Sequence, residues 1–175
     1  MTALLLALYM HGLLPVQAQT KEKWEREWLY RLQLAEAISQ ATSDPGRQLL
    51  LARLARFESS YREDVGRCRF NGKAGDRTAF QIVARNDAER ARLCVSLADD
   101  ARFALERINE SLTACRKLPA AERLAVYARG SCASEEGRKL SRHRWPSASE
   151  VASYERALRP EGDADGSAAV VHAAE

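Results

Sequence analysis

The length, composition and charge of this chain favour one folded domain and argue against nucleic-acid recognition. Of its 175 residues, 46% are hydrophobic and 29% are charged, which is enough apolar material for a buried core. The formal net charge of +3 is only mildly basic, and no basic run is interleaved with aromatic residues, so sequence-specific binding of nucleic acid is not expected.

The N-terminal residues have the pattern of a secretory signal peptide. Residues 3–16 are apolar apart from Tyr9 and His11, and this run is shorter than the roughly 20 residues that a spanning helix needs. It ends in the small-residue cleavage pattern Val16-Gln17-Ala18. We therefore predict a signal peptide over residues 1–18 and a periplasmic or secreted protein. No Lys or Arg precedes the apolar run, so a buried first helix or an uncleaved membrane anchor is the alternative.

Two amphipathic helices are predicted next. The first covers residues 21–41, where apolar side chains recur at helical spacing (Trp24, Trp28, Leu32, Ala35 and Ile38). The stretch "SDPG" ends it and begins the second helix, at residues 46–61. The following residues are rich in glycine, which indicates turns, and "TAFQIV" (78–83) is predicted as a short strand or an extended loop.

Helical patterns return after residue 83. Helices are expected within 84–94, 96–115, 119–127 and 134–141, and "SASE" (147–150) is a capping box before a last helix. From Arg159 the composition turns to Gly, Asp, Ala and Ser. We predict a mainly α domain over 21–145, a C-terminal helix over 146–158 and a disordered tail over 159–175.

The four cysteines, Cys68, Cys94, Cys115 and Cys132, all follow the predicted signal peptide. None of their spacings is the short pair that zinc sites use, so no metal is predicted. An even number in an exported chain indicates disulfides, with three pairings possible. Cys68–Cys94 and Cys115–Cys132 are favoured because each closes a local loop; four reduced cysteines in a cytosolic protein are the alternative.

Glu58 lies beside the apolar face of the second helix, between Leu51 and Leu54. Removal of a carboxyl group from water disfavours its charged form, so such a side chain holds a proton near neutral pH. A glutamic acid of this kind can protonate the leaving oxygen of a glycosidic bond. The alternative is a glutamate that reaches solvent or pairs with an arginine such as Arg62.

Three motifs give this chain a resemblance to a known family. "FESSYRED" (57–64) resembles the Glu-Ser signature of the SLT-type lytic transglycosylases, which share the goose-type lysozyme fold. "TAFQI" (78–82) and "LAVYARGSC" (124–132) stand where that family has a G-L-M-Q-like loop and an A-x-Y-N-A-G motif. The resemblance covers residues 46–132, with Thr78 in place of a glycine and Ala128-Arg129 in place of Asn-Ala.

The resemblance implies a lysozyme-like helical domain with a short loop or β region after the catalytic helix, and two disulfides. Glu58 would be the only acid/base on the β-1,4 bond between N-acetylmuramic acid and N-acetylglucosamine, leaving 1,6-anhydro ends. Ser59 would orient Glu58 or a sugar, Gln81 would bind substrate, and Tyr127 would hydrogen-bond to Glu58 or the N-acetyl group. No cofactor is implied; the partner is a peptidoglycan strand, during wall remodelling or at a secretion or conjugation apparatus.

Several alternatives stay open at this point. A hydrolase would need a second carboxylate about 6.5–9.5 Å from the acid to activate water, and Asp76 is the best candidate. A lysozyme-like module that binds glycan or protein without cutting, or an unrelated disulfide-linked helical protein, would also have this pattern. Ser59, Gln81 and Tyr127 would then be a helix-end serine, a loop residue and a core residue.

Overall fold

The computed structural model describes residues 2–16, 20–69 and 78–159, and this part of the chain is mainly helical, with two disulfides and no β-strand. In chain order, its elements are α1 (Thr2–Leu13), α2 (Lys21–Ala41), α3 (Pro45–Ser59), α4 (Glu63–Gly66), α5 (Asp87–Arg92), α6 (Leu97–Ala114), the 3-10 turn η1 (Ala120–Glu122), α7 (Ala125–Arg129), α8 (Glu135–Arg144) and α9 (Ala148–Leu158). Residues 78–81, expected as strand or extended loop, form a turn.

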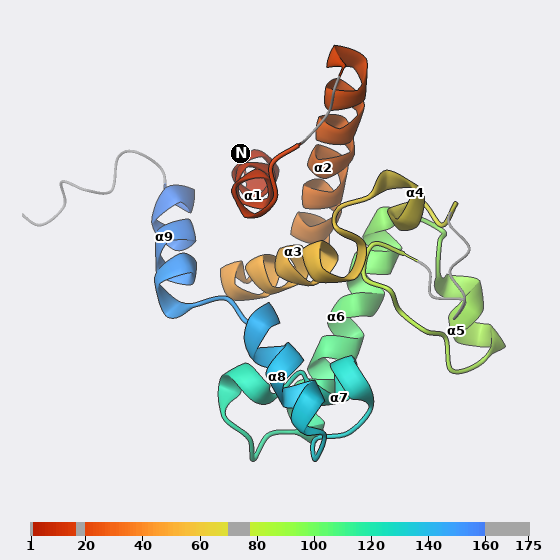
Figure 1. Cartoon of the computed structure of the whole chain (residues 1–175), viewed down its shortest axis with the longest axis vertical. Helices are drawn as coiled ribbons and strands as arrows, with labels where there is room; N and C mark the ends of the chain where they lie inside the picture. The colour runs from red at the N-terminus through yellow and green to blue at the C-terminus, as the bar shows by residue number, and fades with distance from the viewer. Residues whose placement is uncertain (1, 17–19, 70–77, 160–175) are drawn as a thin grey trace, which may run out of the picture.

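Helix α3 lies at the centre of the fold. It packs against α1, α2, α6, α8 and α9, while α2 also contacts α1 and α6 (Figure 1). The core between these helices contains fully buried side chains from α2, α3 and α6, among them Leu34, Ile38, Leu50, Leu54 and Ile108. This position means that the C-terminal end of α3 meets α8 inside the molecule, and Glu58 belongs to that end.

Local capping fixes the helix starts that the sequence predicts. The N-cap side chains of α2, α3, α6 and α9 each accept a hydrogen bond from a backbone N–H in the first turn, and at α9 Ser147 and Glu150 form both bonds of the capping box. The prediction of a helix over 21–41 is confirmed. The second helix ends at Ser59 instead of residue 61, because Ser60 turns the backbone into the left-handed region (φ 52°).

The predicted helix over 119–127 is wrong as a continuous element. Residues 120–122 form η1, and α7 begins only at Ala125. The cause is a side chain from α8: the backbone N–H of Leu124 donates to the Ser141 hydroxyl (3.0 Å) instead of to a carbonyl of its own helix. Helix α8 also extends three residues beyond the predicted end at 141, to Arg144.

Helix α1 is packed into the core of this chain. Leu6, Ala7 and Met10 are fully buried, and the Tyr9 hydroxyl donates to Glu150 Oε1 (2.9 Å) of α9. This packing is what a buried first helix would have, and removal of residues 1–18 stays a prediction. No helix in the described part of the chain is long and apolar enough to cross a membrane. The tail predicted from residue 159 lies outside the described residues, except for Arg159.

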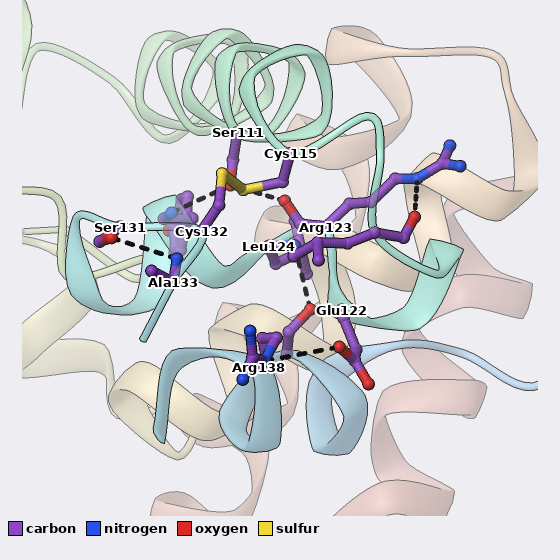
Figure 2. The surroundings of a disulfide bond; sticks show 12 residues. Ser111, Cys115, Glu122, Arg123, Leu124, Ser131, Cys132, Ala133 and Arg138 are labelled. Atoms are coloured by element: carbon purple, nitrogen blue, oxygen red, sulfur yellow. Dashed lines mark hydrogen bonds and ion pairs between the residues drawn. A yellow bond between two sulfur atoms is a disulfide. The ribbon is translucent and has the colours of Figure 1, made fainter. Parts of the chain in front are cut away.

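The favoured disulfide pairing is confirmed. Cys68–Cys94 joins the residues after α4 to those after α5, and Cys115–Cys132 joins the end of α6 to the turn after α7 (Figure 2). The Cα atoms of the two pairs are 5.9 and 5.5 Å apart. Disulfides of this kind are typical of proteins that fold in an oxidising compartment.

Candidate functional site

Glu58 occupies the last turn of α3, and its side chain is 19% exposed. The neighbouring residues Leu51 and Leu54 are fully buried, which agrees with the expected position beside the apolar face. The carboxylate therefore has limited access to solvent.

An arginine that the sequence did not single out pairs with this carboxylate. Arg144, the last residue of α8, donates from Nη2 to Glu58 Oε1 at 2.5 Å. Arg144 is only 8% exposed, so the two charges meet largely out of water. A nearby guanidinium favours the charged carboxylate over the protonated acid, and it therefore opposes the effect of burial. The arginine suggested by sequence, Arg62, binds Asp64 through Nε and Nη2 (3.1 and 2.5 Å).

Ser59 makes a bond within its own helix. It is buried, and its hydroxyl donates to the Ala55 carbonyl (2.7 Å), which is the helix-end role considered as the alternative. The next two residues, Ser60 and Tyr61, have φ values of 52° and 56°. Left-handed residues other than glycine cost roughly 1–2 kcal/mol each, so the sharp end of α3 is held in place by its surroundings. One such contact is the bond from the Tyr61 hydroxyl to the Ala52 carbonyl (3.0 Å).

The turn at 78–82 places Gln81 beside a buried anchor. Phe80 is fully buried, and its backbone N–H donates to the Thr78 hydroxyl (3.2 Å). Thr78 and Gln81 both have positive φ, at 82° and 49°. Thr78 is therefore strained at the position where the resembled family has a glycine, a residue that adopts this conformation without strain. Asp76 lies outside the described residues.

Tyr127 connects α7 to this turn. Its hydroxyl donates to the Phe80 carbonyl (2.9 Å), so the hydrogen bond it makes is not the one predicted to Glu58. Glu58 acts on it through charge: burial first, and then the Glu58 carboxylate, raise the pKa of the Tyr127 phenol above its ordinary range. The helix end, the turn and the tyrosine motif are thus brought together in space.

Two serines from neighbouring helices position α7, which has no side-chain cap of its own. The Ser111 hydroxyl of α6 accepts from the Tyr127 N–H (3.0 Å) and donates to the Arg123 carbonyl (2.8 Å). Ser141 of α8 accepts from the N–H of Leu124. Figure 2 shows Ser111 beside the Cys115–Cys132 disulfide, with Arg123 and Leu124 facing it. The sequence did contain a signal for this role of Ser111, because it is a serine within the apolar face of the helix predicted over 96–115.

Gln81 and Tyr127 line one cavity of about 510 Å³. Its wall also contains Ile82, Arg107 and Glu110, and Arg107 is held by ion pairs with Glu110 (3.0 Å) and with Glu89 of α5 (2.5 Å). Glu58 and Ser59 are not among the described residues of this wall. The structure therefore gives two of the predicted substrate-binding residues a shared cavity, whereas the predicted acid interacts with one of them, Tyr127, through charge. Among the described residues, no group of three or more side chains is placed to bind a metal ion.

Comparisons with known proteins give no match. Neither models of protein families, nor curated proteins, nor solved structures are similar to this chain. The likeness to lytic transglycosylases consequently depends on the three motifs and on the positions of their residues described above.

Proposed function

We propose that this chain is an exported, peptidoglycan-cleaving lytic transglycosylase with a lysozyme-like domain. The observation that supports the proposal most is the meeting of the three motifs, which are distant in sequence. The Tyr127 hydroxyl binds the carbonyl of Phe80, next to Gln81, and the same phenol lies in the field of Glu58. The cavity lined by Gln81 and Tyr127 provides a place for a sugar.

The chemistry would need one carboxyl group. Protonated Glu58 gives its proton to the oxygen of the leaving N-acetylglucosamine as the bond to the anomeric carbon breaks. The C6 hydroxyl of the muramic acid then attacks that carbon, and Glu58 takes the hydroxyl proton. The products are a new N-acetylglucosamine hydroxyl and a 1,6-anhydro ring, and no water is consumed. Gln81 and Tyr127 would hold the glycan strand in the cavity.

A specific observation favours a second candidate, a module that binds glycan or protein without cutting. The ion pair between Glu58 and Arg144 is mostly buried, and a purely structural salt bridge would have the same geometry. Glu58 would then tie α3 to α8 and have no part in proton transfer.

Product chemistry separates these possibilities. Purified sacculi are digested with the protein, and the soluble fragments are analysed by mass spectrometry. A transglycosylase releases anhydro ends, a hydrolase that uses Asp76 releases reducing ends, and a binding module releases neither. Glu58→Gln is expected to lower the release of anhydro ends by about 100-fold or more, since loss of a general acid costs about 10²–10⁴-fold.

The matched control is Glu63→Gln, which changes a nearby carboxylate that pairs with Arg67 on the outside of α4. It should cut as fast as wild type. Equal cutting by Glu58→Gln, or no new ends from the wild-type protein, would refute the proposal.

A further inference from the structure

Arg144 is a buried cation whose hydrogen bonds are incomplete. Its Nη2 donates to Glu58 Oε1, whereas its Nε and Nη1 are buried without a hydrogen-bond partner among the described residues. Unsatisfied donors on a buried charge are unfavourable for folding. The contact with Glu58 is therefore the main polar interaction that this guanidinium makes in the described part of the chain.

A second arginine fixes the backbone from which Arg144 extends. Arg53 of α3 donates from Nε to the Arg144 carbonyl (3.2 Å) and from Nη2 to the His143 carbonyl (2.9 Å). These carbonyls belong to the last turn of α8, where backbone carbonyls have no N–H donors within their own helix. The Nη1 of Arg53 is held in turn by Glu150 of α9 (2.8 Å). Three helices thus position the guanidinium beside Glu58.

Charged and titratable groups from α7 and α8 face Glu58. Arg144 contacts it directly, and Tyr127 and Arg129 of α7 interact with it through charge. Of these three, only Arg144 has a fixed positive charge that is both buried and in contact with the carboxylate.

On the other helices packed on α3, the groups Tyr9, Glu150, Arg31 and Arg107 have contacts of their own. Tyr9 of α1 and Glu150 of α9 bind each other, and Glu150 also binds Arg53. Arg31 of α2 lies over the ring of Tyr61. On α6, Arg107 pairs with glutamates of α5 and α6.

We propose that Arg144 is a positioning residue that holds Glu58 as a carboxylate in one orientation and so confines its proton donation to acidic pH. This inference rests on the proposed function, because it assigns a regulator to the same acid. An opposite charge at this distance shifts the titration of a carboxyl group by about one to three pH units. Activity should therefore fall as pH rises, and loss of Arg144 should extend it to higher pH.

The first test does not depend on activity. The full chain is labelled with ¹³C at its glutamate carboxyl groups, and the Glu58 signal is identified by its absence from Glu58→Gln. We expect Arg144→Gln to move the titration midpoint of this signal upward by about one to three pH units. Arg142→Gln, two residues earlier and paired with Glu122 on the outside of α8, should leave it unchanged. An unchanged midpoint in Arg144→Gln would overturn the inference.

The second test is the pH profile of anhydro release from sacculi. The alkaline limb should move upward in Arg144→Gln, remain in place in Arg142→Gln, and move by a smaller amount in Arg144→Lys, which retains a charge. A lower rate with an unmoved limb would indicate a merely structural role and refute the inference. If Arg144→Gln fails to fold, Arg144→Lys tests the inference instead. The titration midpoint of the Glu58 carboxyl group should then move upward by a smaller amount, and an unchanged midpoint would refute the inference. If no form releases anhydro ends, the proposed function fails and the carboxyl titration still decides the role of Arg144.

Discussion

Replacement of Ser111 by alanine should destabilise the protein well beyond what the loss of one oxygen atom suggests. Ser111 is fully buried, and its hydroxyl serves two backbone groups of the α7 segment, the N–H of Tyr127 and the carbonyl of Arg123. In the alanine variant both backbone groups lose this partner, and α6 still covers them, so water cannot readily replace the hydroxyl. Each unsatisfied group costs about 1–3 kcal/mol, and because Tyr127 and Arg123 are themselves half-buried we expect about 2–3 kcal/mol in total.

Urea unfolding followed by circular dichroism measures this loss. With a slope of roughly 1–3 kcal/mol per molar urea, the midpoint should fall by about 0.7–3 M while the slope stays the same. Ser131→Ala is the matched control, because the Ser131 hydroxyl also accepts a backbone bond, from Ala133 (3.2 Å), but is exposed. The control should lose no more than about 0.5 kcal/mol. A loss below about 1 kcal/mol in Ser111→Ala, or one equal to the control, would refute the reasoning.

Two further predictions concern the packing around α2 and α6. At Gly66 an added methyl group would collide with the hydroxyl of Tyr30, which is 1% exposed, so Gly66→Ala should lower the melting temperature by about 5–10 °C; a melt within 2 °C of wild type would contradict this. Burial raises the pKa of Asp100 from 3.8 to about 6, so the folded protein binds this proton more tightly than the unfolded chain. The stability that this provides is complete below about pH 4 and is lost as pH rises to about 6. Asp100→Asn should therefore be more stable than wild type at pH 7, by up to about 3 kcal/mol, and similar to it at pH 4 in urea titrations. A pH-independent difference would show that Asp100 is not the group responsible.

Local rules explain which parts of the fold were predictable from sequence. The helix over 21–41 and the capping box at Ser147 follow from residues within a few positions of one another, and the structure confirms both. The disulfide pairing was predictable because each bond closes a short loop. The break between η1 and α7 was not, since the Leu124 N–H is taken by Ser141, and nothing in residues 119–127 signals that competitor.

The candidate site likewise has features that local sequence predicts and features that depend on distant residues. The position of Glu58 beside an apolar face follows from helical periodicity, and its burial agrees with that prediction. Its ion pair with Arg144 joins residues that are 86 positions apart, so no local pattern could reveal it. The bond from Tyr127 to the Phe80 carbonyl likewise depends on how α7 is placed by other helices.

Ser111 of α6 and Ser141 of α8 accept hydrogen bonds from the first backbone N–H groups of the α7 segment, and this has a consequence for the order of folding. A five-residue helix is far shorter than one that persists alone in water, and this one receives its first-turn acceptors from α6 and α8. It can form only once α6 and α8 are in place, so the amide proton of Tyr127 should exchange with solvent no faster than α7 separates from α6. Tyr127 would accordingly join the wall of the cavity only after α6 and α8 have folded, and it would leave that wall when either helix separates from α7.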